Sequence, residues 1–490
     1  MSKPFYLTTT LPYVNGDPHI GFALEIIRAD FVVRMKKLAG YDVFFNTGTD
    51  EHGVKIFRKA TELGMNVKDY VDMNASKFKE LLPKLNISSD INFIRTTDEH
   101  HILAAQTFWD KVKENGEKAK DGPYIYKKNY SVKYCPGCEL EKTESELIDN
   151  KCPLHPLQDI EIIEEENYFF KFSAFQEKLL ELYEKNKGLV VPSTRLNEIK
   201  AFVQRGLQDF SISRVKEKMP WGIPVPNDPS QVMYVWFDAL VNYVSAIGWP
   251  CDESDSVCAF DKYWIESGGV VQYCGKDNLR QQAAMWQAML MACGLPASKT
   301  IVIDGFITGE GGIKMSKSLG NTVDPFEIVT EYGSDALRYY VCREISSFED
   351  SPFTMAKFKE AYNAGLANGI GNLTSRVLKM SSVNNITVEL DEKAVDFSVE
   401  DNLLAGFEID KYCDRIWKHI EEADKYIASK QPFKVIKENK AEGEEMIKYL
   451  LKELWIVGLK LRPFLPETAK KIERCMMENK PPAEPLFARR

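Results

Sequence analysis

Hydrophobic and polar residues follow one another in patterns that predict strands near the N-terminus and long helices near the C-terminus. Residues 5–11 mix aromatic and β-branched side chains, as a buried strand does. Asn15-Gly16 then marks a turn, and from Gly21 apolar residues recur at helical spacing. The run LPYVNGDPHIGF, at 11–22, therefore predicts the end of a strand, a tight turn and the start of a helix.

The stretch VIDGFITGEGGIKMSKSLGN, at 302–321, has a similar layout. It predicts a strand, a glycine-rich turn at 309–312 and a loop that holds Lys314 and Lys317. Lysines in such a loop can close over a triphosphate and neutralise charge that develops during a reaction. Taken alone, however, a lysine pair is usually a solvated surface.

The last third of the chain has helical periodicity over long distances. From about residue 356, the stretches 361–380 and 446–475 place apolar residues at spacings typical of a helical bundle. No short-period internal repeat is visible.

Composition narrows the class of protein. A length of 490 residues allows about three domains. The sequence contains neither a membrane-spanning stretch nor the layout of a signal peptide, so we expect a cytoplasmic protein without membrane contact. Ten cysteines spread over this length predict free thiols or metal ligands rather than disulfides. A net charge of −9 confines any contact with nucleic acid to local basic patches.

The turn at 11–22 has the features of an anion site. A helix that follows a first strand offers unpaired N–H groups and the positive end of its dipole. Gly21 would let a ligand approach the backbone, and His19 could donate a hydrogen bond to a phosphate oxygen. The alternative is a surface histidine in an ordinary turn, which is the more common case for an isolated His-x-Gly.

Several motifs together resemble one family. HIGF at 19–22 is similar to the HIGH signature of class I aminoacyl-tRNA synthetases, and KMSKS at 314–318 is identical to their second signature. The surrounding segments resemble the methionyl-tRNA synthetases of that class: LPYVNGDPHIG at 11–21, GTDEHGVKI at 48–56, VWFDALVNY at 235–243 and GKD at 275–277. The resemblance implies activation of L-methionine with ATP and transfer of the methionyl group to tRNA(Met), with Mg²⁺ accompanying the ATP.

The resemblance also implies a fold of class α/β. A doubly wound, Rossmann-type nucleotide-binding sheet would occupy 1–115 and 216–295 and be interrupted by an insertion at 116–215. A linking region with the KMSKS loop would follow at 296–355, and an all-α anticodon-binding domain at 356–490. An insertion of this length leaves little room for the editing domain of the isoleucyl, valyl and leucyl enzymes, which favours methionine. Because no further domain follows, we expect a monomer.

The insertion contains a zinc-knuckle pattern. Cys135-x2-Cys138 and Cys152-x2-His155 are two paired ligand motifs separated by thirteen residues. Three thiolates and one imidazole enclose a tetrahedral Zn²⁺, and four protein ligands leave no open position for a reacting water. We therefore predict one structural zinc ion and a zinc-knuckle insertion.

The resemblance assigns roles to single residues. Asp50 would receive the ammonium group of the substrate. His19 and Lys317 would stabilise the α-phosphate, and Lys314 would assist the outer phosphates. The residues expected around methionine are Leu11, Tyr13, Asp50, Trp236, Ala239, Tyr243 and Gln282, and those around ATP are Asn15, His19, Gly21, Phe22, Asp277, Lys314 and Lys317. Plain core packing remains an alternative for Leu11 and Ala239.

The RNA end is assigned in the same way. NLTSR at 372–376 resembles the anticodon-reading helix, with Asn372 and Arg376 on one helical face. Phe433 stands where the family commonly has a tryptophan that stacks on an anticodon base, and a phenyl ring can also stack. An ordinary exposed helix face is the alternative for Asn372 and Arg376.

Two positions depart from the family pattern. Phe22 replaces the second histidine of the HIGH signature, and Gln282 stands where a histidine usually lines the methionine pocket. These departures leave open a non-catalytic relative that binds RNA or senses methionine.

Overall fold

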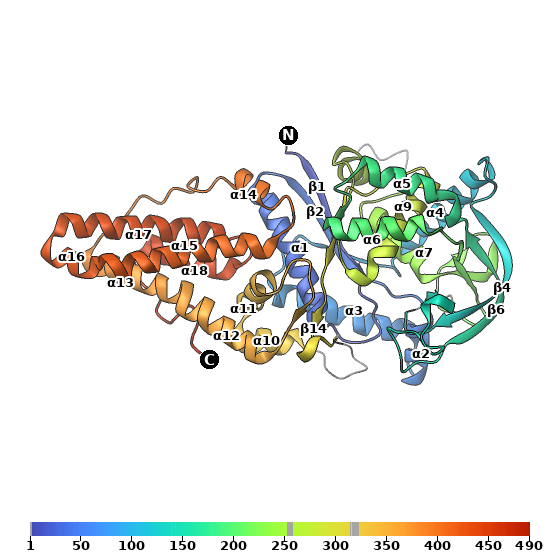
Figure 1. The fold of residues 1–490 in the computed structure, drawn as a ribbon, viewed down its shortest axis with the longest axis horizontal. Coiled ribbons are helices and arrows are strands. Elements are labelled where there is room, and N and C mark those ends of the chain that lie inside the picture. Colours follow the sequence, from blue (N-terminus) through green and yellow to red (C-terminus); the bar gives the residue numbers. More distant parts are fainter. Residues whose placement is uncertain (1, 139, 143, 252–257, 314, 316–322) are drawn as a thin grey trace.

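The computed structural model describes all residues except 1, 139, 143, 252–257, 314 and 316–322. An α/β part and an elongated helical part lie side by side, with the helices extending to one side of the molecule (Figure 1). Within the described residues no helix combines the length and the apolar character needed to cross a membrane.

A six-stranded parallel sheet forms the centre of the α/β part. Its order is β3 (Asn92–Arg95), β2 (Asp42–Thr49), β1 (Pro4–Thr9), β12 (Val271–Gly275), β13 (Thr300–Asp304) and β7 (Val190–Val191). Neighbours run parallel throughout. The strands β1, β12 and β13 are mainly apolar because helices cover both faces of such a sheet. From β1 the chain extends to β2 on one side and from β12 to β13 on the other, so the crevice of this doubly wound fold lies between β1 and β12. The prediction of this fold is confirmed.

Helix α1 (Ile20–Leu38) connects the sheet to the helical part. Most of its residues are buried, and charged side chains within it form buried ion pairs with other elements. Arg28 contacts Asp304 at the end of β13, and Asp30 contacts Arg338 of α11 (Ser334–Tyr339). The other helices of the α/β part are α2 (Val54–Glu62), α3 (Val67–Lys84), α4 (Glu99–Glu117), α5 (Gln176–Lys185), α6 (Ser193–Gln204), α7 (Val235–Leu240), α8 (Asn242–Ser245) and α9 (Trp286–Cys293).

The segment predicted as an insertion, 116–215, forms a sheet of its own. Its four antiparallel strands are β5 (Leu140–Lys142), β4 (Ile125–Cys135), β6 (Glu161–Phe170) and β8 (Phe210–Ser211). A further antiparallel sheet consists of β10 (Pro224–Val225), β11 (Asp228–Met233) and β9 (Ser213–Val215). The insertion is not fully separate, because β7 lies within 116–215 and joins the edge of the central sheet. The exact domain boundaries stay a prediction.

The linking region and the C-terminal third follow the sheet. Strand β14 (Ile307–Thr308) pairs with β15 (Ser351–Pro352), and α10 (Pro325–Tyr332) lies between them in sequence. The C-terminal helices are α12 (Met355–Ala361), the π-helical stretch Tyr362–Gly371, α13 (Asn372–Asn384), α14 (Phe397–Leu403), α15 (Ile409–Lys430), α16 (Pro432–Glu438), α17 (Lys440–Leu461) and α18 (Pro466–Glu478). The predicted helical bundle is confirmed, and one apolar core runs from α1 into it.

Two cysteines contradict the expectation of free thiols. Cys251 and Cys258 form a disulfide, whereas the remaining eight cysteines are unpaired. The sequence argument considered the spread of cysteines over the whole chain and overlooked this pair, which is only seven positions apart. A short connection can bring two Cα atoms within bridging distance, here 5.9 Å.

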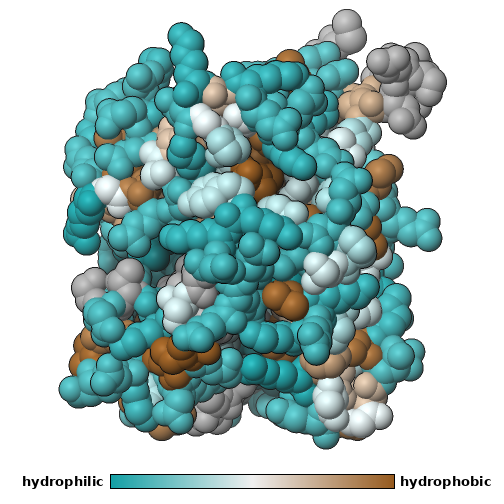
Figure 2. Space-filling model, turned by 90° about the vertical axis from the view of Figure 1, so that its right-hand side faces the viewer, coloured by the Kyte–Doolittle hydropathy of each residue, from teal (hydrophilic) through white to brown (hydrophobic). Residues whose placement is uncertain are grey.

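The surface at the end opposite the helical bundle is mainly hydrophilic. Figure 2 shows apolar residues there as separate small groups between polar ones. Isolated exposed apolar residues are normal on soluble domains. The candidate site therefore has to be sought in a hollow rather than on an apolar face.

Candidate active site

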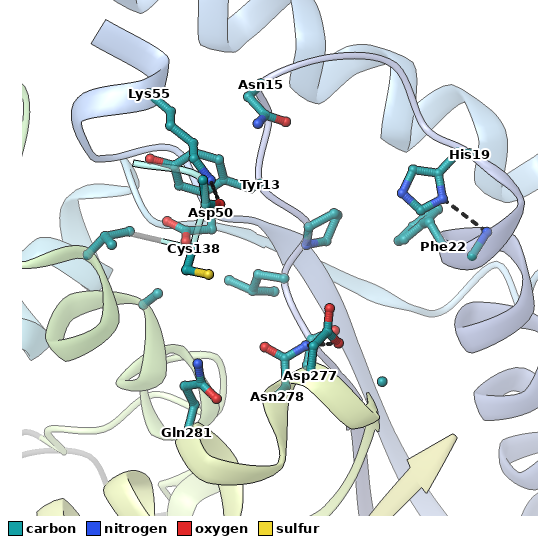
Figure 3. A pocket seen from close by; sticks show the side chains of 18 of the residues that line it. Tyr13, Asn15, His19, Phe22, Asp50, Lys55, Cys138, Asp277, Asn278 and Gln281 are labelled. Atoms are coloured by element: carbon teal, nitrogen blue, oxygen red, sulfur yellow. Dashed lines mark hydrogen bonds between the residues drawn. The ribbon is translucent and has the colours of Figure 1, made fainter. Parts of the chain in front are cut away.

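A cavity of about 1090 Å³ opens at the carboxyl ends of the central strands. Twelve of the predicted methionine and ATP residues line it: Leu11, Tyr13, Asn15, His19, Gly21, Phe22, Asp50, Trp236, Ala239, Tyr243, Asp277 and Gln282. These residues come from motifs as far apart as 11–22 and 275–282. Figure 3 shows Tyr13 and Asp50 on one side of the cavity, Asp277 on a second side and His19 on a third. Lys314 and Lys317, the two predicted lysines, lie outside the described residues.

His19 is the N-cap of α1. Its backbone is extended, and its Nδ1 accepts a hydrogen bond of 3.0 Å from the Gly21 N–H (Figure 3). Because Nδ1 is an acceptor, the proton of the neutral ring sits on Nε2, the nitrogen that can donate to a ligand. A Cβ at Gly21 would lie 2.8 Å from Cε1 of His19, so glycine is required for the ring to lie over the helix end. His19 itself is exposed to the cavity.

The expectation of unpaired N–H groups at the start of α1 is wrong. The Ile20 N–H donates to the carbonyl of Val323, and the Gly21 N–H donates to His19. The N–H groups of Phe22 and Ala23 both donate to the carbonyl of His19. The protein thus satisfies the donors that a helix terminus leaves open, and the helix acts on an anion through its dipole and the His19 ring.

Phe22 has become part of the core. It is 9% exposed and packs edge-to-face against Phe78 of α3, with ring centroids 5.1 Å apart. A phenyl ring offers no hydrogen bond to a phosphate, so the donors on this side of the cavity are fewer than in the HIGH signature. Packing against Phe78 gives Phe22 a structural function instead.

Backbone pairing beyond the strand ends places Asp50 beside Tyr13. The Asp50 N–H donates to the carbonyl of Pro12, and the Val14 N–H donates to the carbonyl of Asp50. The Asp50 side chain is 6% exposed and borders the cavity. A nearly buried carboxyl group at this position can pair with a cation such as an ammonium group.

Helix α7, which carries Trp236 and Ala239, is fixed to the end of β2 by buried polar contacts. Oδ2 of Asp238 lies 2.9 Å from Nδ1 of His52, and His101 of α4 approaches the other oxygen at 3.4 Å. Burial raises the pKa of Asp238, but the two histidines outweigh this and hold the pKa below its usual value. Sequence patterns singled out none of these three residues.

Gln282 belongs to a buried chain of hydrogen bonds. Nε2 of Gln272 donates to Oε1 of Gln282 at 2.6 Å, and Nε2 of Gln282 donates to the hydroxyl of Tyr243 at 2.7 Å. The first bond fixes the orientation of the Gln282 amide and makes its nitrogen a donor. The hydroxyl of Tyr243 is therefore an acceptor in this chain, which leaves its own proton for another partner.

The four predicted metal ligands converge. Ligand atoms of Cys135, Cys138, Cys152 and His155 all lie within 4.8 Å of one another. Sγ of Cys138 is 3.5 Å from Sγ of Cys152 and 3.3 Å from Nδ1 of His155. A zinc–sulfur bond of about 2.3 Å in a tetrahedron gives sulfur–sulfur edges of about 3.8 Å, so this donor set fits Zn²⁺. Gly137 is required at the turn, since a Cβ there would lie 2.3 Å from Cγ of His155.

The knuckle forms one wall of the cavity. Nζ of Lys55, at the start of α2, donates to the carbonyl of Gly137 at 2.5 Å. Arg58 of α2 makes two bonds to the carboxylate of Glu161, at 2.9 and 3.2 Å. Cys138 and His155 border the same cavity as Asp50 (Figure 3 shows Cys138). Metal binding and the shape of the cavity are thus physically connected.

Two acids that line the cavity, the buried Asp304 and the partly buried Glu25, were missed by sequence reasoning. Glu25 lies one helical turn after Phe22, and Asp304 ends β13. Burial raises the pKa of Glu25 to about 8, against two hydrogen bonds from Thr10. Burial likewise raises the pKa of Asp304 to about 6, against the charge of Arg28. The available signal was a pair of charges, Glu25 and Arg28, within the mainly apolar first half of α1.

The residues predicted to read RNA lie in the helical part. Asn372 is the first residue of α13 and is exposed. Nη1 of Arg376 is 2.9 Å from Oδ1 of Asp424 in α15, and both side chains are partly exposed. Phe433, in α16, is 42% exposed. A phenyl ring that remains exposed to this degree can take part in stacking.

Comparison with known proteins agrees with this arrangement. Residues 5–378 match the family described as tRNA synthetases class I (M). The chain belongs to this family.

Relatives and solved structures of the family cover nearly all of the chain. The methionine–tRNA ligase of Caldanaerobacter subterraneus is 39% identical over 491 residues, covering 96% of this chain and 74% of that protein. The methionine–tRNA ligase of Brucella suis is 38% identical over 486 residues, covering 96% and 91%. The structure of Mycobacterium tuberculosis methionyl-tRNA synthetase in complex with methionyl-adenylate superimposes with a TM-score of 0.85 at 35% identity, covering 96% of this chain and 93% of that one.

Proposed function

We propose that the protein is a methionine–tRNA ligase. It activates L-methionine with ATP to methionyl-adenylate and pyrophosphate, and then transfers the methionyl group to the 3′ end of tRNA(Met). The observation that carries the proposal is the single cavity lined by the residues of the HIGF, GTDEH, VWFDA and GKD segments. Relatives named methionine–tRNA ligase, and a structure described as a complex with methionyl-adenylate, support it.

At the methionine end, Asp50 receives the ammonium group of the substrate. The aromatic rings of Tyr13 and Trp236 contact the thioether, whose polarisable sulfur interacts favourably with aromatic side chains. The free proton of the Tyr243 hydroxyl can be donated to the sulfur, which is a weak acceptor. Leu11, Ala239 and Gln282 complete the walls of this end.

In the first reaction a carboxylate oxygen of methionine attacks the α-phosphorus of ATP, the bond to the bridging oxygen breaks and pyrophosphate leaves. Nε2 of His19 and the dipole of α1 stabilise the charge that develops on the α-phosphate. Lys317 acts there too, and Lys314 on the outer phosphates. Asn15, Gly21, Phe22 and Asp277 line the path of the nucleotide. Mg²⁺ accompanies ATP and neutralises its outer phosphates.

The knuckle holds one structural Zn²⁺ through Cys135, Cys138, Cys152 and His155. Because a structural metal contributes its binding energy to folding, Cys152→Ser should lose the metal and loosen the insertion. Elemental analysis measures zinc per chain, and Cys293→Ser, at a buried cysteine outside the cluster, is the control. A zinc content near zero in the unmodified protein would contradict the assignment.

The RNA partner is tRNA(Met), bound through Asn372, Arg376 and Phe433. Stacking on Phe433 and hydrogen bonds from the α13 face suit unstacked anticodon bases. Such a function places the protein in the cytoplasm.

The deciding experiment is methionine-dependent exchange of pyrophosphate with ATP, followed by charging of tRNA(Met). We expect exchange with methionine and not with leucine or cysteine. A protein that exchanges with none of the twenty amino acids, yet binds methionine or tRNA, would instead be the non-catalytic relative. Exchange without charging would refute only the RNA part of the proposal.

A further inference from the structure

Asp304 is a buried acid that the protein satisfies on one oxygen only. Its side chain is 3% exposed, and Oδ1 lies 3.2 Å from Nη1 of Arg28. The other oxygen, Oδ2, is buried and has no hydrogen-bond partner among the described residues. Asp304 lines the cavity at the carboxyl end of β13. A buried carboxylate oxygen without a donor is costly, and because Asp304 lines the cavity, a bound ligand can supply that donor.

Arg28 cannot supply that second donor. Its guanidinium group already donates to four backbone carbonyls in the segment before β15. These belong to Val341, Ile345, Ser346 and Ser347. A fork-shaped, two-bond contact would have used both oxygens of Asp304. The pKa of Asp304 stays raised in spite of Arg28, in agreement with a charge that is only partly compensated.

The surroundings of Asp304 disfavour a phosphate and favour a hydroxyl donor. Glu25 and Asp277 line the same wall, and both Asp277 and Asp304 raise the pKa of Glu25. Acids gathered on this wall disfavour a triphosphate, even though Glu25, with its pKa raised to about 8, is mostly neutral near pH 7. His19 attracts the phosphates on another side of the cavity. Asp50, which is proposed to bind the ammonium group of methionine, follows the end of β2. Asp304 instead ends β13 and is paired with Gly275, the last residue of β12. A nucleoside placed along β12 and β13 would bring its ribose hydroxyls to this wall.

We propose that Oδ2 of Asp304 accepts a hydrogen bond from a ribose hydroxyl of ATP, which makes Asp304 a nucleotide-specificity residue of this enzyme. The inference rests on the proposed function, because it names ATP as the occupant. The proposal predicts discrimination between ATP and one of its two monodeoxy analogues.

Asp304→Asn provides a sharp test. Because Arg28 donates to this side chain, the amide oxygen stays on the side of Arg28 and an N–H₂ donor replaces the acceptor Oδ2. We expect kcat/KM for ATP in the exchange reaction to fall about tenfold to a hundredfold, which is the range for one hydrogen bond to a charged group. One of the two analogues, 2′-deoxyATP or 3′-deoxyATP, lacks the hydroxyl that bonds Asp304. With that analogue, Asp304→Asn should change kcat/KM less than threefold relative to the unmodified protein. The KM for methionine should stay constant.

Asp42→Asn is the matched control, since Asp42 lies at the opposite end of β2 and pairs with Lys262 and Tyr263. It should leave the ratio of ATP to deoxyATP activity unchanged. Equal losses with ATP and both analogues in Asp304→Asn would show a structural function through Arg28 and overturn the proposal. A change confined to methionine would overturn it as well. If the variant fails to fold, the unmodified protein still decides, because equal use of ATP and both analogues contradicts the inference.

Calorimetric binding of adenosine, 2′-deoxyadenosine and 3′-deoxyadenosine separates this inference from the proposed function. Weaker binding of one deoxynucleoside, without any exchange activity, would support the ribose contact and refute the ligase. Exchange activity together with equal binding of the three nucleosides would support the ligase and refute the ribose contact.

Discussion

The two ends of the cavity solve the burial of polar groups in different ways. Behind the methionine site, the neutral side chains of Gln272, Gln282 and Tyr243 are linked by a directed chain of hydrogen bonds. At the acidic wall of Glu25, Asp277 and Asp304 the polar groups are acids, and Asp304 keeps an oxygen without a donor among the described residues. The amides of the first group bond to one another, whereas the second group keeps a buried acceptor that a ligand can meet.

The difference has an energetic consequence. A directed chain of neutral amides fixes a shape at low cost, because each donor meets an acceptor. Buried acids stay costly when ionised, and raised pKa values express that cost. We therefore expect substitutions in the amide chain behind the methionine site to change shape and methionine affinity, and substitutions at the acidic wall to change pH dependence and nucleotide affinity.

The largest effect is expected at His19, on the third side of the cavity. His19→Ala should lower the exchange rate by at least ~100-fold, the typical loss for one preorganised donor to a developing charge. The KM values for methionine and ATP should change less. The variant His19→Asn distinguishes the two functions of this residue, because an asparagine can still accept a hydrogen bond from the Gly21 N–H but has no imidazole donor. Its thermal stability should therefore be close to that of the unmodified protein, while its exchange rate should stay low. A harmless His19→Ala would make the turn purely structural.

Behind the methionine site, Gln282→Met removes the donor to Tyr243 and the acceptor for Gln272. Leaving buried partners unsatisfied costs about 1–3 kcal/mol. The KM for methionine should therefore rise roughly tenfold or more, while the KM for ATP stays constant. Steady-state exchange kinetics with each substrate varied in turn measure both. A larger change in the KM for ATP than in the KM for methionine would contradict the distinction between the methionine site and the acidic wall.

At the acidic wall, Glu25→Gln should flatten the dependence of stability on pH. The folded-state pKa of Glu25, about 8, lies above the ordinary value of 4.5, so the folded protein binds the proton more tightly than the unfolded chain. This contribution is present at low pH and is lost as pH rises from about 4.5 to 8, by at most about 1.4 kcal/mol per pH unit. Urea unfolding at pH 5, 6, 7 and 8 tests it. Identical slopes for both proteins would show that Glu25 is ionised throughout.

The smallest effect is expected for Phe22→His. The new ring would replace an edge-to-face contact with Phe78 and restore a possible donor near the α1 terminus. Since His19 and the helix dipole already act there, the exchange rate should change by less than about tenfold, in either direction. The thermal midpoint, measured alongside the rate, reports the packing cost. A gain beyond a hundredfold would mean that the site lacks an essential donor.

Sequence alone supplied a large part of this description. Strand, turn and helix at 5–38, the helical third beyond 356 and the four knuckle ligands follow from residue types at fixed spacings, because local backbone geometry sets those periods. Resemblance to a family supplied the pocket residues, which the fold then brought to one cavity. Spacing could not reveal Asp304 or His101, since their partners lie in other elements.

Two errors have the same origin. The N–H groups at the start of α1 were expected to be open, but Val323, three hundred positions away, occupies one of them and the His19 side chain another. The disulfide between Cys251 and Cys258 depends on how close their two Cα atoms come, which their spacing alone does not fix. A sequence determines which groups a chain contains and the local elements that carry them. Which donors meet acceptors, and which buried acids are left for a ligand to satisfy, depends on contacts between distant elements, and only the tertiary structure decides these.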